Sequence, residues 1–153
     1  MAQQLTATAA AEAGLANTEL NRLVGIARAA AEQGGAELMR HYGRLASIES
    51  KGRVGDLVTN ADLAAEKVVL DVLAASTPDI AVLAEESGAA GEQDGLRWCV
   101  DPLDGTTNFA HGYPFFATSI GLTFRQKPVL GAIAVPFLGE VYWGAPGVGA
   151  FCN

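Results

Sequence analysis

The sequence predicts an α+β fold in which two helices precede a mainly antiparallel sheet. Apolar residues recur at helical spacing in two segments before residue 80, and short apolar runs separated by turn residues follow it. Half of the 153 residues are apolar and 18% are charged, a composition typical of a globular protein with a sizeable core. No internal repeat or linker divides the chain, so we expect one folded part over residues 18–153. Residues 1–17 are rich in Ala, Thr and Gln, and we expect them to form a flexible tail.

The first helix is predicted between Thr18 and Leu45, because its apolar residues follow the helical period. These residues are Leu20, Leu23, Val24, Ala27, Ala31, Leu38, Met39 and Tyr42. The Gly34-Gly35 pair either interrupts this helix or marks a close contact with another element. His41 lies within the helix and has no Cys or His partner at ligand spacing, so we expect a structural role for it.

The second helix is predicted from Thr59 to about Ser76. Thr59 can cap this helix, and Asp62 stands three residues later, where a capping box has its acidic partner. A glycine-rich basic loop over residues 51–55 precedes the helix, and Thr77-Pro78-Asp79 ends it. The leucines expected to face the core are Leu63, Leu70 and Leu73.

The remaining elements are predicted to be strands joined by loops and turns. A short buried strand at Ile80–Ala84 is followed by a polar loop at Ala89–Gly95 and a strand at Arg97–Val100. Turn residues at Gln126-Lys127-Pro128 and Leu138-Gly139 then separate apolar runs that suit hairpin-connected antiparallel strands. These runs are Thr118–Phe124, Val129–Phe137, Glu140–Trp143 and Gly147–Asn153.

The composition also argues against some functions. A net charge of −7 argues against nucleic acid as a partner, because the chain has no basic patch to contact phosphates. No apolar run approaches the length that spans a membrane. Cys99 and Cys152 lie within apolar runs and are expected to be small core residues in a reducing compartment.

The segment Trp98–Phe109 carries the strongest chemical signal. Asp101 and Asp104 stand three residues apart at the end of an apolar strand, and Pro102 favours an extended conformation before it. The Gly-Thr-Thr sequence at residues 105–107 can turn the chain tightly and open a helix whose N-terminal N–H groups bind an anion. Carboxylates beside an anion site imply a cation between them, and hard oxygen ligands around phosphate favour Mg²⁺. The alternative is an ordinary strand, Asp-Gly turn and short helix.

This string resembles the signature of the inositol monophosphatase family of Mg²⁺-dependent phosphatases. The resemblance continues over residues 110–122 (AHGYPFFATSIGL) and includes Leu83–Gly88 (LAEESG) and Asp56–Asp62 (DLVTNAD). It covers the chain from about Leu20 to its end. It is closest to the inositol monophosphatase-like members, including those of plastids and bacteria, since the nucleotide-directed branch usually carries a lysine where Thr107 stands. The resemblance implies the family's layered α/β sandwich, of which this chain resembles the N-terminal half.

The resemblance also implies a metal site built from oxygen ligands. Glu85 would bind Mg²⁺, whereas the role of Glu86 stays open, because successive side chains of an extended backbone point to opposite faces. Asp101 would bridge two ions, with the Leu103 backbone carbonyl on the first and Asp104 on the second. From the residues alone, the two glutamates at a strand end can equally be a solvated pair.

The same resemblance implies the catalytic groups. Thr106 would pair with Asp62 and, together with Glu85, orient the attacking water. The phosphate would lie against Gly105, Thr106 and Asp104. From the residues alone, Thr106 can instead be a helix cap, and Asp62 can be an acid that favours the third helical position whatever the function.

Other polar and aromatic residues are weaker candidates. Lys51 and Asp56 belong to a loop in which such residues are usually solvated, although the family places a lysine near a third metal. His111 follows the signature, and we expect a packing or surface role for it. The aromatic residues of Tyr113–Phe116 are expected in the core rather than on a substrate surface.

The predicted function is therefore Mg²⁺-dependent hydrolysis of a phosphate monoester, with myo-inositol 1-phosphate or a similar polyol phosphate as substrate. One alternative is a related phosphatase acting on histidinol phosphate, fructose bisphosphate or a phosphorylated nucleotide. The other is a non-catalytic half-domain that binds metal or a partner. We expect the full-length form to be a homodimer in the cytoplasm or the plastid stroma. The family closes its second metal site with a later Trp-Asp motif that does not occur here, so we expect residues 1–153 alone to bind Mg²⁺ weakly, to associate through open strand edges and to show background hydrolysis.

Overall fold

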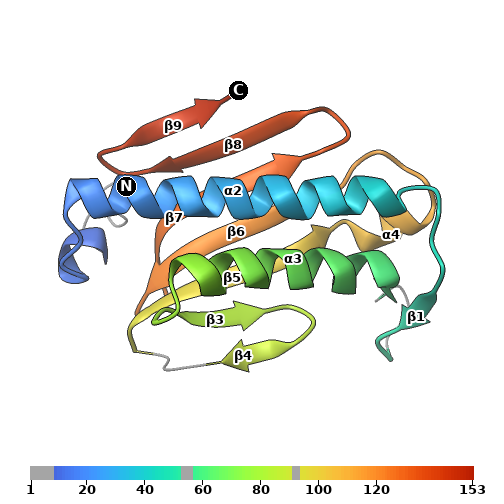
Figure 1. Ribbon diagram of the computed structural model, residues 1–153, viewed down its shortest axis with the longest axis horizontal. Coiled ribbons are helices and arrows are strands. Elements are labelled where there is room, and N and C mark those ends of the chain that lie inside the picture. Colours follow the sequence, from blue (N-terminus) through green and yellow to red (C-terminus); the bar gives the residue numbers. More distant parts are fainter. Residues whose placement is uncertain (1–8, 53–56, 91–93) are drawn as a thin grey trace.

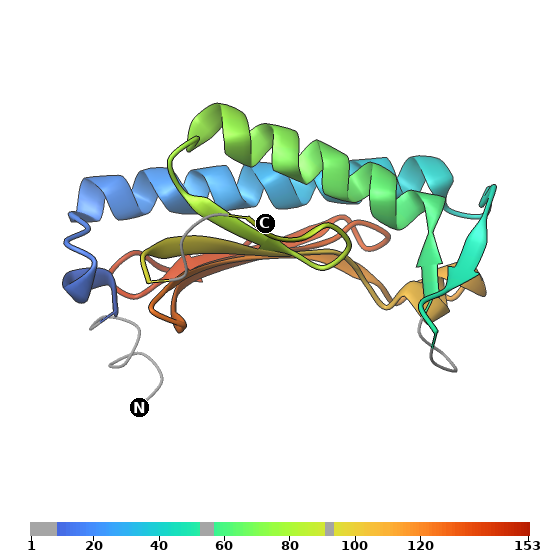
Figure 2. The same ribbon diagram turned by 90° about the horizontal axis from the view of Figure 1, so that it is seen from below.

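Two long helices lie side by side on one face of a seven-stranded sheet (Figures 1 and 2). The computed structural model describes residues 9–52, 57–90 and 94–153. The helices are α2 (Asn17–His41) and α3 (Asn60–Ser76). The predicted α+β order, with two helices before a mainly antiparallel sheet, is confirmed. Among the described helices, none has both the length and the apolar character needed to cross a bilayer.

The sheet has the strand order β4-β3-β5-β6-β7-β8-β9. Its strands are β3 (Ala81–Ala84), β4 (Gly88–Ala90), β5 (Leu96–Asp104), β6 (Ala117–Phe124), β7 (Lys127–Val135), β8 (Glu140–Ala145) and β9 (Gly149–Cys152). Only β3 and β5 pair in parallel, and the other neighbours are antiparallel. A separate hairpin of β1 (Ile48–Ser50) and β2 (Leu57–Thr59) precedes α3, and the short helix α4 (Thr106–Ala110) follows β5. The parallel pair therefore brings the C-terminal ends of β3 and β5 to the same edge of the sheet.

Helix α2 is continuous through Gly34-Gly35, which pack closely against other elements. A Cβ atom on Gly34 would lie 2.8 Å from the Val69 side chain and 2.9 Å from that of Thr118. These glycines therefore let α2 approach both α3 and the sheet. The helix ends four residues before its predicted end at Leu45, because Tyr42 is extended and the chain turns at Gly43.

Helix α3 begins as predicted, with Thr59 as its N-cap and a complete capping box. The expectation that Leu63 faces the core is wrong, because 56% of this residue is exposed. The buried stripe follows Ala61, Ala65, Val69 and Leu73 at helical spacing. Leu63 lies two residues from the start of that stripe, which turns it to the solvent face.

Three strand predictions need correction. The first strand is only partly buried, and Leu83 is 37% exposed because alternate residues point to the sheet face that the helices do not cover. Strand β4 occupies the start of the predicted loop at Ala89–Gly95, of which residues 91–93 lie outside the described part. Strand β5 runs four residues beyond its predicted end, with an irregularity between Asp101 and Asp104.

The later strands agree with the predictions to within about two residues at each end. The first turn lies slightly earlier than expected, at Arg125 and Gln126, which both have positive φ. Lys127 and Pro128 therefore belong to β7. The second turn has Gly139 at φ 68°, as the Leu138-Gly139 pair predicts.

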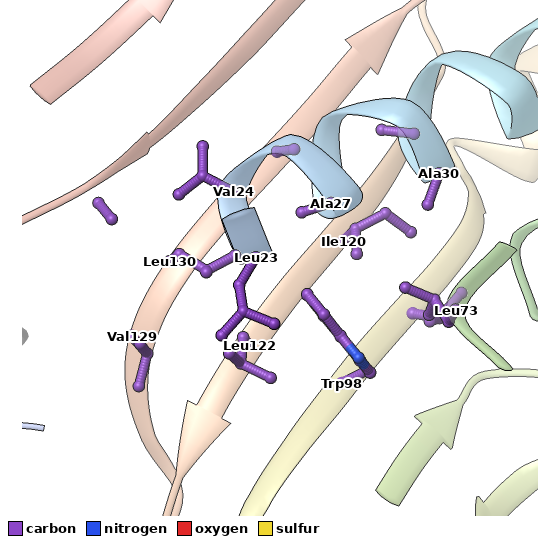
Figure 3. Close-up of a cluster of buried hydrophobic side chains, with 14 of the residues drawn as sticks. Leu23, Val24, Ala27, Ala30, Leu73, Trp98, Ile120, Leu122, Val129 and Leu130 are labelled. Atoms are coloured by element: carbon purple, nitrogen blue, oxygen red, sulfur yellow. The ribbon is translucent and has the colours of Figure 1, made fainter. Parts of the chain in front are cut away.

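The main core lies between the two helices and the sheet (Figure 3). Trp98 is fully buried there, and its indole N–H donates to the Thr77 hydroxyl at 2.9 Å, so the one polar atom of this large side chain is satisfied. Ala9 and Ala10 are buried in the same core, so this part of the expected tail packs against the folded part of the chain. A second apolar cluster lies at the other end of the helices. It consists of Leu38, Ala61, Ala65, Leu103, Phe109 and Phe116.

Several side chains expected in the core are exposed. Tyr113 and Phe115 are 56% and 65% exposed and stack on each other, whereas Phe116 is buried as expected. Cys152 is exposed because it lies on the edge strand β9, and Cys99 is half-buried. Met39 is also exposed, at 38%. The uncovered face of the sheet and the turn after α4 account for most of these differences.

Candidate active site

Glu85 directly follows the end of β3, and Asp101 lies within β5. Each comes one residue after a member of the parallel pair Ala84 and Val100. The Glu85 N–H donates to the Val100 carbonyl at 3.1 Å, which continues the strand register and sets the two acids side by side. Burial, a hydrogen bond with Glu85 and the charges of Glu85 and Asp104 raise the pKa of Asp101 to about 7. In the described part of the structure, Asp101 Oδ1 is buried without a hydrogen-bond partner. The pair therefore presents oxygen atoms that a cation would stabilise.

Lys51 brings a positive charge to Glu85 and to the neighbouring Glu86. Its Nζ lies 3.1 Å from Glu85 Oε1 and 2.6 Å from Glu86 Oε1. Burial opposes its charge, but hydrogen bonds to Glu86 and Glu85 raise the pKa of Lys51 well above its ordinary value, so it stays protonated. Burial raises the pKa of Glu86, and Lys51 partly offsets this effect. Lys51, a weaker candidate from the sequence, therefore contacts Glu85 in the structure. The other weaker candidate of that loop, Asp56, lies outside the described residues.

Asp62 and Thr106 meet across 44 positions of the chain. Thr106 Oγ1 lies 3.0 Å from Asp62 Oδ1 and 3.0 Å from the Leu103 carbonyl oxygen, so its single hydroxyl hydrogen has two possible acceptors. Asp62 is 1% exposed, and its Oδ2 accepts from the Thr59 N–H at 2.8 Å and from the Thr59 hydroxyl. Asp62 therefore has the capping role that its position predicts and also contacts Thr106.

Thr106 is not the N-cap of α4, which is Gly105 and provides no side-chain hydrogen bond. The helix-cap alternative for Thr106 is therefore wrong. Gly105 has φ 88°, and a Cβ atom there would lie 2.8 Å from the Phe115 carbonyl oxygen, so only glycine fits without strain. This turn takes the chain from β5 directly into α4 and places the N–H groups of Gly105 and Thr106 at the start of that helix.

The predicted metal ligands do not all converge. In the part of the chain that the structure describes, no three acidic, histidine or cysteine side chains lie close enough together to hold a metal ion. Asp104 is exposed and acts on Asp101 through its charge. The donor set nevertheless fits Mg²⁺ in kind, because it is all oxygen and includes the unpartnered buried Asp101 Oδ1.

The carboxylates open onto a hollow of about 450 Å³ on the uncovered face of the sheet. Glu85 and Asp101 line one part of it, and Leu83, Cys99 and Gly121 line another. These acids therefore line the hollow on the side of the sheet opposite the helices.

The two histidines have local roles. His41 Nδ1 lies 3.0 Å from Asn60 Nδ2 and its Nε2 lies 3.2 Å from Glu37 Oε1, which agrees with the structural role expected for it. The exposed His111 has its Nδ1 2.8 Å from the Thr107 carbonyl oxygen, one turn earlier in the chain. Neither contact involves the acids of the candidate site.

Glu66 is a residue that the sequence analysis missed. It is 4% exposed, and its Oε2 accepts from the Glu86 N–H at 2.8 Å. Its position four residues after Asp62 places both acids on one helix face, which is the signal that could have found it.

Comparisons with known proteins agree with this geometry. Residues 19–153 match the sequence model described as the inositol monophosphatase family. An inositol-1-monophosphatase of Synechocystis sp. is 44% identical over 137 residues, which are 89% of this chain and 48% of that protein. A fructose-1,6-bisphosphatase/inositol-1-monophosphatase of Aquifex aeolicus is 39% identical over 136 residues, which are 88% of this chain and 51% of that protein.

Among solved structures, extragenic suppressor protein suhB from Bartonella henselae superposes with a TM-score of 0.80 at 41% identity. The match covers 86% of this chain and 52% of that one. The chain thus spans about half the length of the curated relatives that it matches.

Proposed function

Because the chain belongs to the inositol monophosphatase family, we propose that its protein is a Mg²⁺-dependent phosphatase that hydrolyses inositol 1-phosphate to inositol and phosphate. The observation that carries this proposal is the Glu85–Asp101 pair, with one buried carboxylate oxygen left unpartnered in the described structure. A protein retains such a pair of acids where a cation compensates their charge.

Glu85, Asp101 and the Leu103 carbonyl would hold one Mg²⁺ ion, and Asp101 and Asp104 would hold a second. The bound ions would lower the pKa of a water molecule and offset the charge of the phosphoryl oxygens. The all-oxygen donor set supports this assignment, as does the raised pKa of Asp101, which a nearby positive charge would return toward its ordinary value.

Thr106 would orient the attacking water. With its hydrogen donated to Asp62, the hydroxyl oxygen keeps lone pairs that can accept from water. Asp62 is buried and held by Thr59, so the hydroxyl has a fixed acceptor. Orientation of this kind lowers the barrier because the reacting water no longer has to be ordered.

The phosphate group would lie at the turn between β5 and α4. The N–H groups of Gly105 and Thr106 make no intrahelical hydrogen bond at this position and would donate to phosphate oxygens. Asp104, directly before them, would lie beside the same phosphate group. The strict requirement for glycine at residue 105 supports a turn of fixed shape.

Fructose 1,6-bisphosphate is the second candidate substrate, because the Aquifex relative is named for both activities. Histidinol phosphate and phosphorylated nucleotides complete the set of alternatives. We further propose that the full-length protein is a homodimer of the cytoplasm or the plastid stroma.

The test is phosphate release by the protein expressed from its complete reading frame, with Mg²⁺ and a panel of these esters. We expect the highest kcat/KM with inositol 1-phosphate, and loss of turnover with Asp101→Asn. Asp79→Asn provides a matched control and should leave the rate unchanged, because Asp79 is exposed in the turn before β3, at the end of that strand opposite Glu85. Preference for another ester would correct the substrate, and no release from any ester would favour the non-catalytic alternative.

A further inference from the structure

Glu66 is a buried acid that links helix α3 to the turn after β3. It is 4% exposed, and its Oε2 accepts the Glu86 N–H at 2.8 Å across 20 positions of the chain. A hydrogen bond of this length holds its donor in a fixed position, whether the acceptor is charged or neutral.

The turn that Glu66 contacts holds both glutamates of the candidate site. Residues 85–87 connect β3 to β4, and successive N–H groups of this turn are held by different elements. The Glu85 N–H donates to Val100 in β5, whereas the Glu86 N–H donates to Glu66 in α3. The two bonds together set the direction in which the chain leaves β3, and so the direction of the Glu85 side chain toward Asp101.

Packing within helix α3 does not explain why an acid occupies position 66. On α3 the preceding residue, Ala65, and the residue one turn later, Val69, are fully buried and apolar, and an apolar side chain at residue 66 would pack there without loss of hydration.

We propose that Glu66 is a positioning residue, which holds the Glu85–Glu86 turn through the Glu86 N–H and thereby sets the affinity of the site for a divalent cation. This inference rests on the metal site proposed above. Groups that orient metal ligands typically change metal affinity 10-fold to 100-fold when they are removed.

The experiment compares Glu66→Leu, which has no acceptor, with Glu66→Gln, which keeps a neutral acceptor of the same length. Mg²⁺ and Mn²⁺ binding are measured by calorimetry, and exchange of the Glu86 amide hydrogen is measured by NMR. Asp71→Leu on the same helix is the control, because Asp71 is exposed and pairs with Lys67.

We expect Glu66→Leu to weaken metal binding about ten-fold and to accelerate exchange of the Glu86 amide. Glu66→Gln should stay within about two-fold of the wild type in metal affinity, because a neutral acceptor preserves the turn. Asp71→Leu should change neither quantity.

Wild-type affinity in Glu66→Leu would overturn the proposal, and so would equal losses in Glu66→Gln and Glu66→Leu, since the charge alone would then act. If Glu66→Leu does not fold, the wild type and Glu66→Gln decide, because rapid exchange of the Glu86 amide in either would also overturn it. Absence of metal binding by the wild type would instead contradict the proposed metal site.

Discussion

Metal binding is expected to depend on pH through Asp101. Burial, the hydrogen bond with Glu85 and the neighbouring negative charges raise the pKa of this carboxyl from 3.8 to about 7 in the protein without metal. A cation binds the ionised carboxylate, so it must displace the proton wherever Asp101 is protonated. For a pKa of about 7, roughly nine-tenths of the molecules carry this proton at pH 6 and roughly one-tenth at pH 8. The apparent Kd for Mg²⁺ should therefore be about ten-fold higher at pH 6 than at pH 8.

The sign for stability follows from the same shift. Because the folded protein holds the proton more tightly than the unfolded chain, this group favours folding at low pH. The stability that it contributes to the metal-free protein is lost as pH rises from about 4 to about 7. Metal binding should reverse that trend above pH 7.

Calorimetric titration in two buffers of different ionisation enthalpy measures both the apparent Kd for Mg²⁺ and the number of protons released per bound ion. We expect release of about 0.9 proton per ion at pH 6 and about 0.1 at pH 8. Asp79→Asn, at an exposed position away from the site, should keep this linkage, and Asp101→Asn should lose both affinity and linkage. Equal Kd values at the two pH values, with no proton release at pH 6, would refute the reasoning.

Three further outcomes are expected. Thr106→Ala should lower kcat of the full-length enzyme with little change in KM, because it orients water in the transition state; a normal kcat in steady-state assays would contradict this role. Lys51→Met should strengthen Mg²⁺ binding, because it removes a cation 3.1 Å from Glu85 Oε1, whereas the exposed control Lys67→Met should leave the affinity unchanged. Weaker or unchanged affinity of Lys51→Met, measured by calorimetry, would show that Lys51 does not compete with the ion. Gly105→Ala should lower the free energy of unfolding in urea by about 2–4 kcal/mol, because a side chain at φ 88° is strained and meets the Phe115 carbonyl; a loss below about 0.5 kcal/mol would contradict the tight turn.

Local chemistry explains which parts of the fold the sequence predicted. The capping box of Thr59 and Asp62 depends on residues three positions apart, so the start of α3 could be located from the sequence. Gly139 likewise marks its turn through its own backbone conformation. Leu63 was misplaced because several apolar stripes were possible on an alanine-rich helix, and only packing against the sheet selects one.

Contacts between distant segments explain what the sequence did not predict. Lys51 reaches Glu85 across 34 positions, and nothing in the loop sequence indicates that contact. Glu66 meets Glu86 through the packing of α3 against the sheet. The pairing of Asp62 with Thr106 was expected only from the family resemblance, and the structure does bring the two residues together.

The central claim is that the ends of β3 and β5 bind a divalent cation. Mn²⁺, which shares with Mg²⁺ a preference for oxygen ligands, broadens the NMR signals of nuclei close to it. Titration of the chain with sub-stoichiometric Mn²⁺ is therefore the most direct measurement. We predict that the amide signals of Glu85, Glu86 and residues 101–106 broaden first, and that excess Mg²⁺ restores them. Broadening that begins instead at exposed acids such as Asp71, with sharp signals at residues 101–106, would contradict the claim.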